Sequence, residues 1–251
     1  MELRLEHLVK DFSGTKAVND VSITIQDGKL TGLLGPSGCG KSTTLYLISG
    51  LESPTSGRIF FGDRDVTALP PEKRGIGLVF QNYALYPHMT VYGNMAYALK
   101  IRKVPKREID KRVHEVARIL EIEHLLDRRP GELSGGQRQA LTLLMATMVT
   151  PKILLLDEHT AALDPATAKK VLDLTRQIVA ERKITCLMVT HNMHQALELG
   201  NRTLMMDSGK IILDVSGEKR AGMTVEDLLE QFAVCAGKRL DNDRILFSQA
   251  Q

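Results

Sequence analysis

The segment Gly35 to Ser42 reads Gly-Pro-Ser-Gly-Cys-Gly-Lys-Ser and fits the phosphate-loop pattern G-x-x-x-x-G-K-[ST]. Its glycines let the backbone curl so that successive N–H groups point inward at phosphate oxygens. Lys41 adds a mobile positive charge, and Ser42 supplies an oxygen ligand for Mg²⁺. The alternative is a chance glycine-rich turn, which the apolar run Leu30–Leu34 directly before it disfavours. The segment therefore predicts a nucleoside triphosphate site.

Two carboxylates follow a second apolar run. Ile153 to Leu156 is typical of a buried parallel strand, and Asp157 and Glu158 come at its C-terminal end. Asp157 is predicted to hold the Mg²⁺ shell, and Glu158 to accept a proton from an attacking water. Because many strands end in acids, this pair is a weak signal alone and a strong one after a phosphate loop.

The segment Leu133-Ser134-Gly135-Gly136-Gln137 allows two interpretations. Ser134 and Gln137 have the S-x-x-Q spacing of a capping box, an ordinary helix start. A Ser hydroxyl and glycine N–H groups at a helix N-terminus also form an anion site that can face a γ-phosphate. This segment precedes Asp157 by about 20 residues, and on it the chain resembles the ATP-binding-cassette (ABC) ATPases, whose signature sequence is Leu-Ser-Gly-Gly-Gln.

The resemblance covers nearly the whole chain, from Leu3 to about Ile212, and implies that the ligands are ATP and Mg²⁺. Phe12 matches an aromatic ring that stacks on adenine, and Gln81 a glutamine that senses Mg²⁺, water and the transport partner. Asp164 matches a loop that communicates across a dimer, and His191 a histidine that contacts the γ-phosphate. Each also has a structural alternative: Phe12 as a packed surface aromatic, Gln81 as a strand-end polar residue, His191 as a helix cap.

The predicted site thus has three sets of residues. The catalytic set is Glu158, His191 and Gln81. The metal set is Ser42, Gln81 and Asp157. The nucleotide-binding set is Phe12, Gly35, Pro36, Ser37, Gly38, Cys39, Gly40, Lys41, Ser42, Thr43, Ser134, Gly135, Gly136, Gln137 and Asp164.

The elements that must position these residues alternate along the chain. Short strand patterns fill the opening third, at Leu3–Leu8, Val21–Ile25, Leu30–Leu34, Arg58–Phe61 and Ile76–Gln81. Helical periodicity runs from about Thr90 to Val149, and strand and helix alternate again afterwards. The sequence predicts an α/β P-loop NTPase core with an N-terminal antiparallel β subdomain and an inserted helical subdomain at about 83–149. The ATPase domain is expected to span 1–235, and the polar tail 236–251 is expected to fray.

Composition bounds the function classes. The chain has 251 residues, 43% hydrophobic and 25% charged, which is ordinary for a globular protein. A formal net charge of +3, with basic residues spread among acids, gives no nucleic-acid footprint. Three cysteines at unrelated spacings indicate neither a disulfide framework nor a zinc site. Without a bilayer-spanning run or a secretory signal pattern, the chain is expected to stay in the cytoplasm. The resemblance implies a place at the cytoplasmic face of the membrane, bound through permease subunits.

The N-terminal half, to about Gln139, is similar to the ATPases of maltose-type sugar importers, above all at Val79 to Val91. The second half is more similar to ATPases of amino-acid-type importers, which suggests a mosaic. Leu141 to Thr147 replaces the usual Arg-containing signature helix, and His159 stands where proline is common. The further C-terminal regulatory domain of maltose-type ATPases has no counterpart in the 251 residues.

The resemblance implies a homodimer that drives import through integral membrane permease subunits, together with an extracytoplasmic solute-binding protein. One alternative is a soluble ABC ATPase of DNA repair or of the ribosome, although such proteins usually carry a long coiled-coil insertion or two cassettes. A second is a monomeric phosphate-loop kinase, against which the signature sequence argues. The transported solute cannot be read from this chain.

Overall fold

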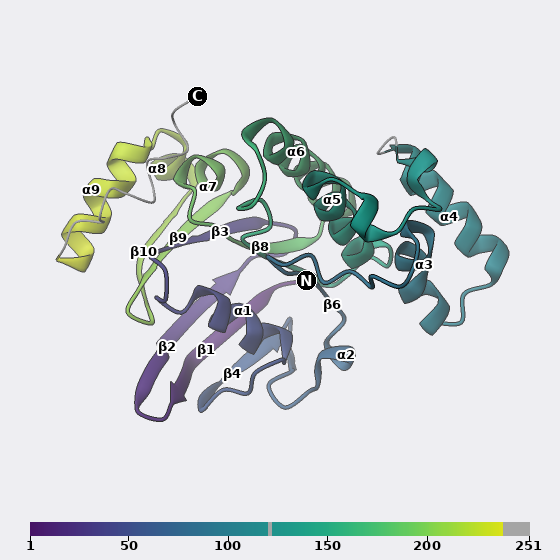
Figure 1. The fold of residues 1–251 in the computed structure, drawn as a ribbon. Coiled ribbons are helices and arrows are strands. Elements are labelled where there is room, and N and C mark those ends of the chain that lie inside the picture. Colours follow the sequence, from purple (N-terminus) through teal and green to yellow (C-terminus); the bar gives the residue numbers. More distant parts are fainter. Residues whose placement is uncertain (120–121, 238–251) are drawn as a thin grey trace.

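A computed structural model describes residues 1–119 and 122–237. Within these ranges the strands form two sheets that lie on either side of helix α1 (Lys41–Ser49), with further helices above the larger sheet (Figure 1). The predicted fold class, an α/β core with an N-terminal antiparallel sheet and an inserted helical part, is confirmed.

The smaller sheet is antiparallel, with strand order β2-β1-β4-β5. Its strands are β1 (Leu3–Phe12), β2 (Thr15–Ile25), β4 (Ser56–Phe61) and β5 (Arg64–Asp65). The first two form a hairpin closed by Ser13 and Gly14, both with the positive φ that tight hairpin turns require. Both strands are longer than the apolar pattern predicts, because backbone pairing continues through polar residues such as Asp11 opposite Lys16.

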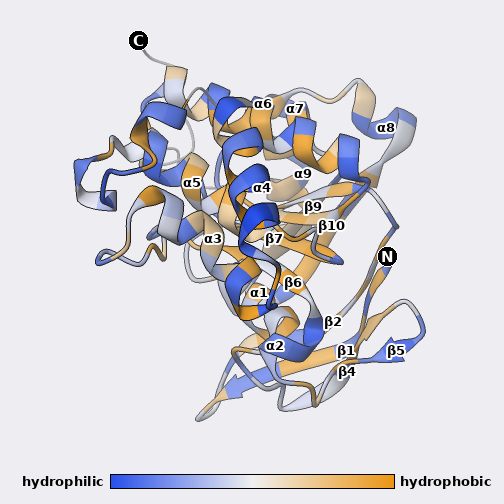
Figure 2. Ribbon diagram, turned by 90° about the vertical axis from the view of Figure 1, so that its right-hand side faces the viewer, coloured by the Kyte–Doolittle hydropathy of each residue, from blue (hydrophilic) through white to orange (hydrophobic). Residues whose placement is uncertain are grey.

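The larger sheet has the order β10-β9-β3-β8-β7-β6 and is parallel except for β10. Its strands are β3 (Leu30–Leu34), β6 (Ile76–Val79), β7 (Ile153–Asp157), β8 (Thr185–Val189), β9 (Arg202–Asp207) and β10 (Lys210–Ser216). Both faces are covered, as parallel sheets require. Leu155 packs toward α1 and the small sheet, whereas Leu154 and Leu156 pack toward the helical part. Figure 2 shows these strands as mostly hydrophobic.

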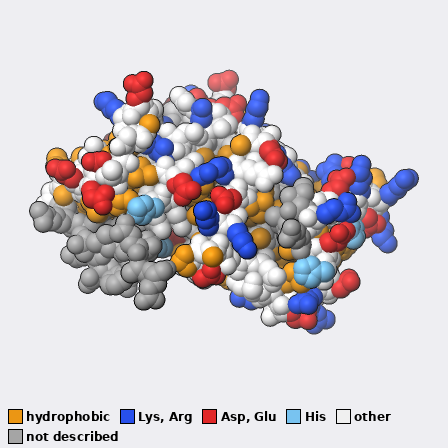
Figure 3. Space-filling view, turned by 90° about the horizontal axis from the view of Figure 1, so that it is seen from above, with side chains coloured by type: hydrophobic (Ala, Val, Ile, Leu, Met, Phe, Trp, Pro, Cys, Tyr) orange, Lys and Arg blue, Asp and Glu red, His pale blue; other side chains and the backbone are white. Residues whose placement is uncertain are grey.

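The inserted helical part lies between β6 and β7. It comprises α3 (Val91–Ile101), α4 (Lys106–Ile119), the short helices η1 (Glu123–Leu125) and η2 (Pro130–Glu132), and α5 (Gly135–Thr147). Helix α3 contacts α4 and α5, and α5 also contacts β6 and α6 (Pro165–Arg182). Positive and negative side chains are interspersed over the face seen from above, and Lys and Arg gather at the end where α4 lies (Figure 3).

Some elements were not predicted. These are β5, α2 (Pro71–Arg74), α8 (Gly217–Ala221) and α9 (Val225–Ala236). Helix α9 contacts β10 and α7 (Met193–Leu199), and buries Val225, Leu228 and Phe232. Residues 238–251 of the predicted tail lie outside the described residues. Among the described helices, none is long and apolar enough to cross a bilayer.

Arg74 holds α1 from the end opposite the phosphate loop. Its side chain is 2% exposed. The guanidinium donates to the carbonyls of Leu47 and Ile48, in the last turn of α1, at 2.8 Å each. It also donates to Thr67 and Leu69. Because the last carbonyls of a helix lack intrahelical donors, this buried cation satisfies them and complements the helix dipole.

Candidate active site

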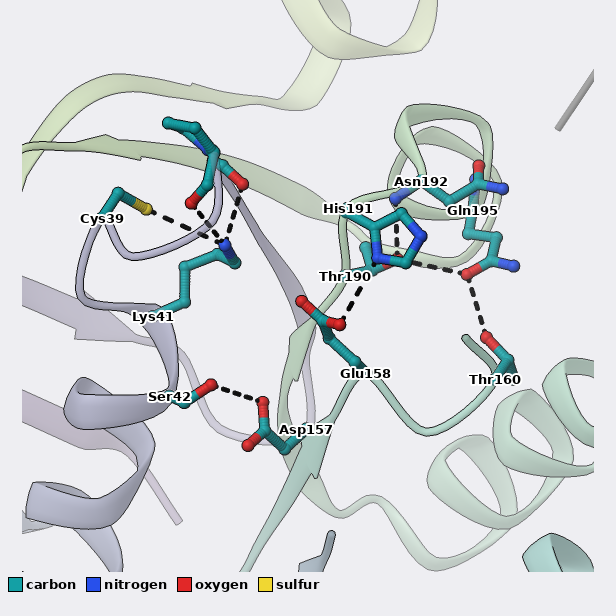
Figure 4. Close-up of polar contacts among 12 residues, drawn as sticks. Cys39, Lys41, Ser42, Asp157, Glu158, Thr160, Thr190, His191, Asn192 and Gln195 are labelled. Atoms are coloured by element: carbon teal, nitrogen blue, oxygen red, sulfur yellow. Dashed lines mark hydrogen bonds and ion pairs between the residues drawn. The ribbon is translucent and has the colours of Figure 1, made fainter. Parts of the chain in front are cut away.

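The ends of three neighbouring parallel strands meet at one edge of the large sheet. Val189 of β8 lies opposite Leu33 of β3 on one side and opposite Asp157 of β7 on the other. The residues that follow these strands are the phosphate loop, Glu158 and Thr190-His191, so the topology brings three distant segments together (Figure 4).

The phosphate loop is closely packed at two of its glycines. A Cβ on Gly35 would lie 2.2 Å from the carbonyl oxygen of Met206, and one on Gly40 would lie 2.1 Å from that of Ala17. Both glycines also have positive φ, so neither position accepts another residue without strain. The loop is therefore fixed in shape by its surroundings as well as by its own sequence.

Lys41 and the backbone N–H groups give the loop its positive character. Lys41 is 5% exposed, and its Nζ donates to the carbonyls of Gly35 at 2.8 Å and Pro36 at 2.9 Å. This ammonium was predicted to be mobile, but here it bridges the loop. Helix α1 has no side-chain cap, and the N–H groups of Gly38, Gly40 and Ser42 have no hydrogen-bond acceptor within the described ranges. Such a helix N-terminus can bind an anion.

Asp157 lies next to Ser42, so the two predicted Mg²⁺ ligands are close together. Ser42 Oγ donates to Asp157 Oδ1 at 3.0 Å, and Tyr46 Oη donates to Oδ2 at 3.3 Å. Burial raises the pKa of Asp157, which is 4% exposed, and the Ser42 hydrogen bond opposes that rise. Hydroxyl and carboxylate oxygens fit Mg²⁺, which usually takes one or two protein ligands beside phosphate and water.

Sequence reasoning missed Tyr46. Its position four residues after Ser42 on α1 is the signal that could have found it, since residues at that spacing share a helix face. Burial, followed by the neighbouring Asp157 charge, raises the pKa of the Tyr46 hydroxyl.

Glu158 and His191 follow the ends of the neighbouring strands β7 and β8, and their side chains face each other. Glu158 Oε2 lies 3.5 Å from His191 Nδ1, and their side chains are 22% and 46% exposed. The hydrogen bond with His191 is the main cause that lowers the pKa of Glu158, so this carboxyl is ionised and able to accept a proton. Both residues line a cavity of about 340 Å³ between α6 and α7.

The Glu158 backbone is left-handed, with φ 44°, which is uncommon for a residue with a side chain. Such a conformation persists only where surrounding contacts impose it. Glu158 N donates to Val189 O at 3.0 Å, and Ala161 N donates to Glu158 O at 3.0 Å. The next residue, His159, is 3% exposed, with Nε2 at 3.2 Å from Thr175 Oγ1 on α6.

The signature segment forms the capping box that its spacing predicts. Gln137 N donates to Ser134 Oγ at 3.2 Å, and Ser134 N donates to Gln137 Oε1 at 2.9 Å. Gly136 packs closely on α6, since a Cβ there would lie 2.0 Å from Thr167 Cγ2 unless that side chain moved. The capping interpretation is therefore correct, and the anion-binding role of the same N-terminus remains a prediction.

Several predicted residues lie apart from this cluster. Phe12 is 46% exposed, with Lys10 Nζ at 4.7 Å from its ring centroid. Gln81 was expected to end a strand, but β6 ends at Val79, and Gln81 is exposed in the following turn. Asp164 caps α6 by accepting from Thr167 N at 3.0 Å. Within the described residues, none of these and neither Ser134 nor Gln137 bonds to Ser42, Asp157 or Glu158.

Protonation of His159 makes stability depend on pH. Burial lowers the pKa of His159 to about 4 from 6.5, so the folded chain keeps the ring neutral while the unfolded chain binds a proton below about pH 6.5. The free energy of unfolding is therefore highest above pH 6.5. It decreases as the pH falls toward 4, by about 2 kcal/mol at pH 5. Glutamine does not titrate, so between pH 7.5 and pH 5 the free energy of unfolding of His159→Gln should fall by about 2 kcal/mol less than that of the wild type, measured by urea unfolding. An equal loss in both proteins would contradict this prediction.

Comparison with known proteins gives the family. A family model described as ABC transporter matches residues 18–161. Similar proteins include a sulfate/thiosulfate import ATP-binding protein of Agrobacterium fabrum, 46% identical over 84% of this chain and 63% of its own length. A trehalose/maltose import ATP-binding protein of Thermococcus litoralis is 44% identical over 82% of this chain and 57% of its own. The chain thus spans about 60% of the length of these relatives.

Solved structures agree. A cassette from Clostridium perfringens, part of the ABC transporter complex cbiONQ, has a TM-score of 0.80 and 30% identity, covering 92% of this chain and 94% of its own. A dimeric cassette in a post-hydrolysis state with ADP and Pi has a TM-score of 0.77 and 28% identity, covering 85% of this chain and 98% of its own. On the sequence and the fold together, this chain belongs to the ABC transporter family.

Proposed function

We propose that this chain is the ATP-binding subunit of an importer, and that it binds and hydrolyses ATP to drive transport through separate membrane subunits. The observation that carries the proposal is the convergence of the phosphate loop, the Ser42–Asp157 pair and the Glu158–His191 pair at one sheet edge. The names of the relatives support the importer role, since they are import ATP-binding proteins.

In the proposed reaction the unpaired N–H groups of the loop and Lys41 bind the phosphates of ATP. Ser42 and Asp157 would hold Mg²⁺, which supplies charge neutralisation for the transferred phosphoryl group. Glu158 accepts a proton from the water that attacks the γ-phosphorus, and the bond from the γ-phosphorus to the bridging oxygen of ADP breaks. His191 would contact the γ-phosphate beside the Glu158 carboxylate. Phe12 would stack on the adenine, and Gln81 would contact Mg²⁺ and the attacking water.

We propose further that two copies of the chain complete each site. Among the described residues, Ser134, Gly135 and Gln137 make no hydrogen bond to Ser42, Asp157 or Glu158, so their helix N-terminus is available to the γ-phosphate bound by a second copy. The solved dimeric cassettes support this arrangement. Asp164, exposed at the start of α6, would lie at the same junction.

The membrane partner is proposed to contact the segment from Asn82 to Val91. Asn94 is 1% exposed, and its amide hydrogen-bonds the backbone of Tyr86, Met89 and Thr90, which holds the segment in shape. Ala84 is exposed at its surface, whereas Leu85 is partly buried against the helical core. The chain would therefore lie at the cytoplasmic face of the membrane, bound through permease subunits.

The solute is not proposed. The relatives are named for sulfate, trehalose/maltose and spermidine/putrescine, so one cassette type serves chemically different solutes. Solute choice would then belong to the permease and to a solute-binding protein outside the cell.

Glu158→Gln tests the hydrolytic assignment. The amide keeps the size of the side chain but cannot accept the proton, so single-turnover hydrolysis should fall by about 10²- to 10⁴-fold while ATP binding persists. Glu115→Gln, the same change at an exposed glutamate of α4, is the matched control. Hydrolysis by Glu158→Gln within tenfold of the wild-type rate would remove Glu158 from the role of base.

Met89→Glu tests the membrane contact. A charge in a partly apolar contact segment should release the chain from the membrane fraction of its host cells, with ATP affinity unchanged. The matched control is Leu51→Glu, the same kind of change at a side chain that is 51% exposed and lies after α1. If Met89→Glu stays with the membranes as the wild type does, the segment is not the contact.

A further inference from the structure

Gln195 of α7 joins the two segments that carry Glu158 and His191. Its Oε1 accepts a hydrogen bond from Thr160 Oγ1 at 3.2 Å and another from Thr190 Oγ1 at 3.2 Å (Figure 4). Thr160 comes two residues after Glu158, and Thr190 comes directly before His191. A single carboxamide oxygen therefore connects the loop after β7 to the loop after β8.

The two threonine hydroxyls are buried and depend on Gln195 as a hydrogen-bond partner. Thr160 and Thr190 are 7% and 5% exposed, so their hydroxyls lose hydrogen bonds with water and depend on partners in the protein. Gln195 is itself held at the start of α7, because its N–H donates to Asn192 Oδ1 at 3.0 Å. Asn192 N also donates to Thr190 Oγ1 at 3.0 Å, so the Thr190 hydroxyl has both an assigned donor and an assigned acceptor.

The contacts of Gln195 affect Glu158 because the Glu158 backbone is left-handed. A left-handed glutamate tends to relax unless contacts on both sides fix it. On the side before it, β7 is paired with β8. On the side after it, the hydroxyl of Thr160 is held by Gln195, and His159 is held by Thr175. Since the same Gln195 oxygen also holds Thr190, it sets the loop of His191 relative to the loop of Glu158.

We propose that Gln195 is a positioning residue for ATP hydrolysis, acting through Thr160 and Thr190 to keep Glu158 and His191 in reach of each other. Gln195 does not touch the reacting atoms. Its effect is on the fraction of bound ATP that meets a correctly oriented Glu158, and therefore on kcat rather than on ATP affinity. This inference rests on the proposed ATPase function.

Matched variants of Thr160 test the proposal with little disturbance. Thr160→Val keeps the shape and removes the hydroxyl, so kcat should fall by about tenfold with KM for ATP within twofold of wild type. Thr160→Ser keeps the hydroxyl, so it should retain at least about half of the wild-type kcat. A residue that only stabilised the fold would lower the melting temperature and leave the kcat of the folded protein unchanged.

Gln195→Leu completes a double-mutant cycle on kcat. It should lower kcat by at least as much as Thr160→Val, and the double variant should be no slower than Gln195→Leu alone, because both changes break the same contact. Fully additive losses, an unchanged kcat in Thr160→Val, or a Thr160→Ser as slow as Thr160→Val would overturn the proposal. Failure of wild-type hydrolysis would instead refute the ATPase function itself, so the two failures are distinguishable.

Discussion

The site depends on the parallel register of β3, β8 and β7. Leu33, Val189 and Asp157 lie side by side across the three strands, so the segments that follow them must leave the sheet at one edge. More than a hundred residues separate the phosphate loop from Glu158, and 33 positions separate Glu158 from His191. Hydrogen bonds between the strands set the spacing of these segments. Leucines on both faces of β7, such as Leu154 and Leu155, bury the sheet between the two apolar layers that cover it.

Several contacts hold the residues at this edge of the large sheet in place. Glu158 adopts a backbone conformation that its own chemistry disfavours, and buried contacts at His159 and Thr160 offset this strain. Helix α1 is fixed at its far end by Arg74. The signature segment, by contrast, packs on α6 through Gly136 and makes no hydrogen bond to this edge among the described residues. Under the proposed function, one chain would hold two separate halves of a nucleotide site, which two copies would combine.

Local chemistry was predictable from sequence, and distant contacts were not. The phosphate loop, the Asp157-Glu158 pair and the Ser134–Gln137 capping box depend on residues near each other in the chain, so spacing revealed them. The hydrogen bond between Gln195 and Thr160 joins residues 35 positions apart, which periodicity does not encode. Tyr46 was overlooked although its spacing from Ser42 places both residues on one face of α1. The turn at Gln81 and the polar ends of β1 and β2 were misjudged because backbone pairing, not hydrophobic pattern, sets where those strands end. Helix α9 is amphipathic, but its docking site on β10 and α7 exists only in the folded chain.

The central claim is that each ATP is hydrolysed between the phosphate loop of one copy and the signature helix of another. Mixing two inactive variants, Lys41→Ala and Ser134→Arg, tests it most directly. In mixed dimers both defects fall in one site and the other site is intact, so ATPase activity should rise to roughly a quarter to a half of wild type, provided that one intact site turns over. Activity that stays at baseline, with mixed dimers verified by native mass spectrometry and a Lys41→Ala, Ser134→Arg double variant active when paired with wild type, would contradict the account.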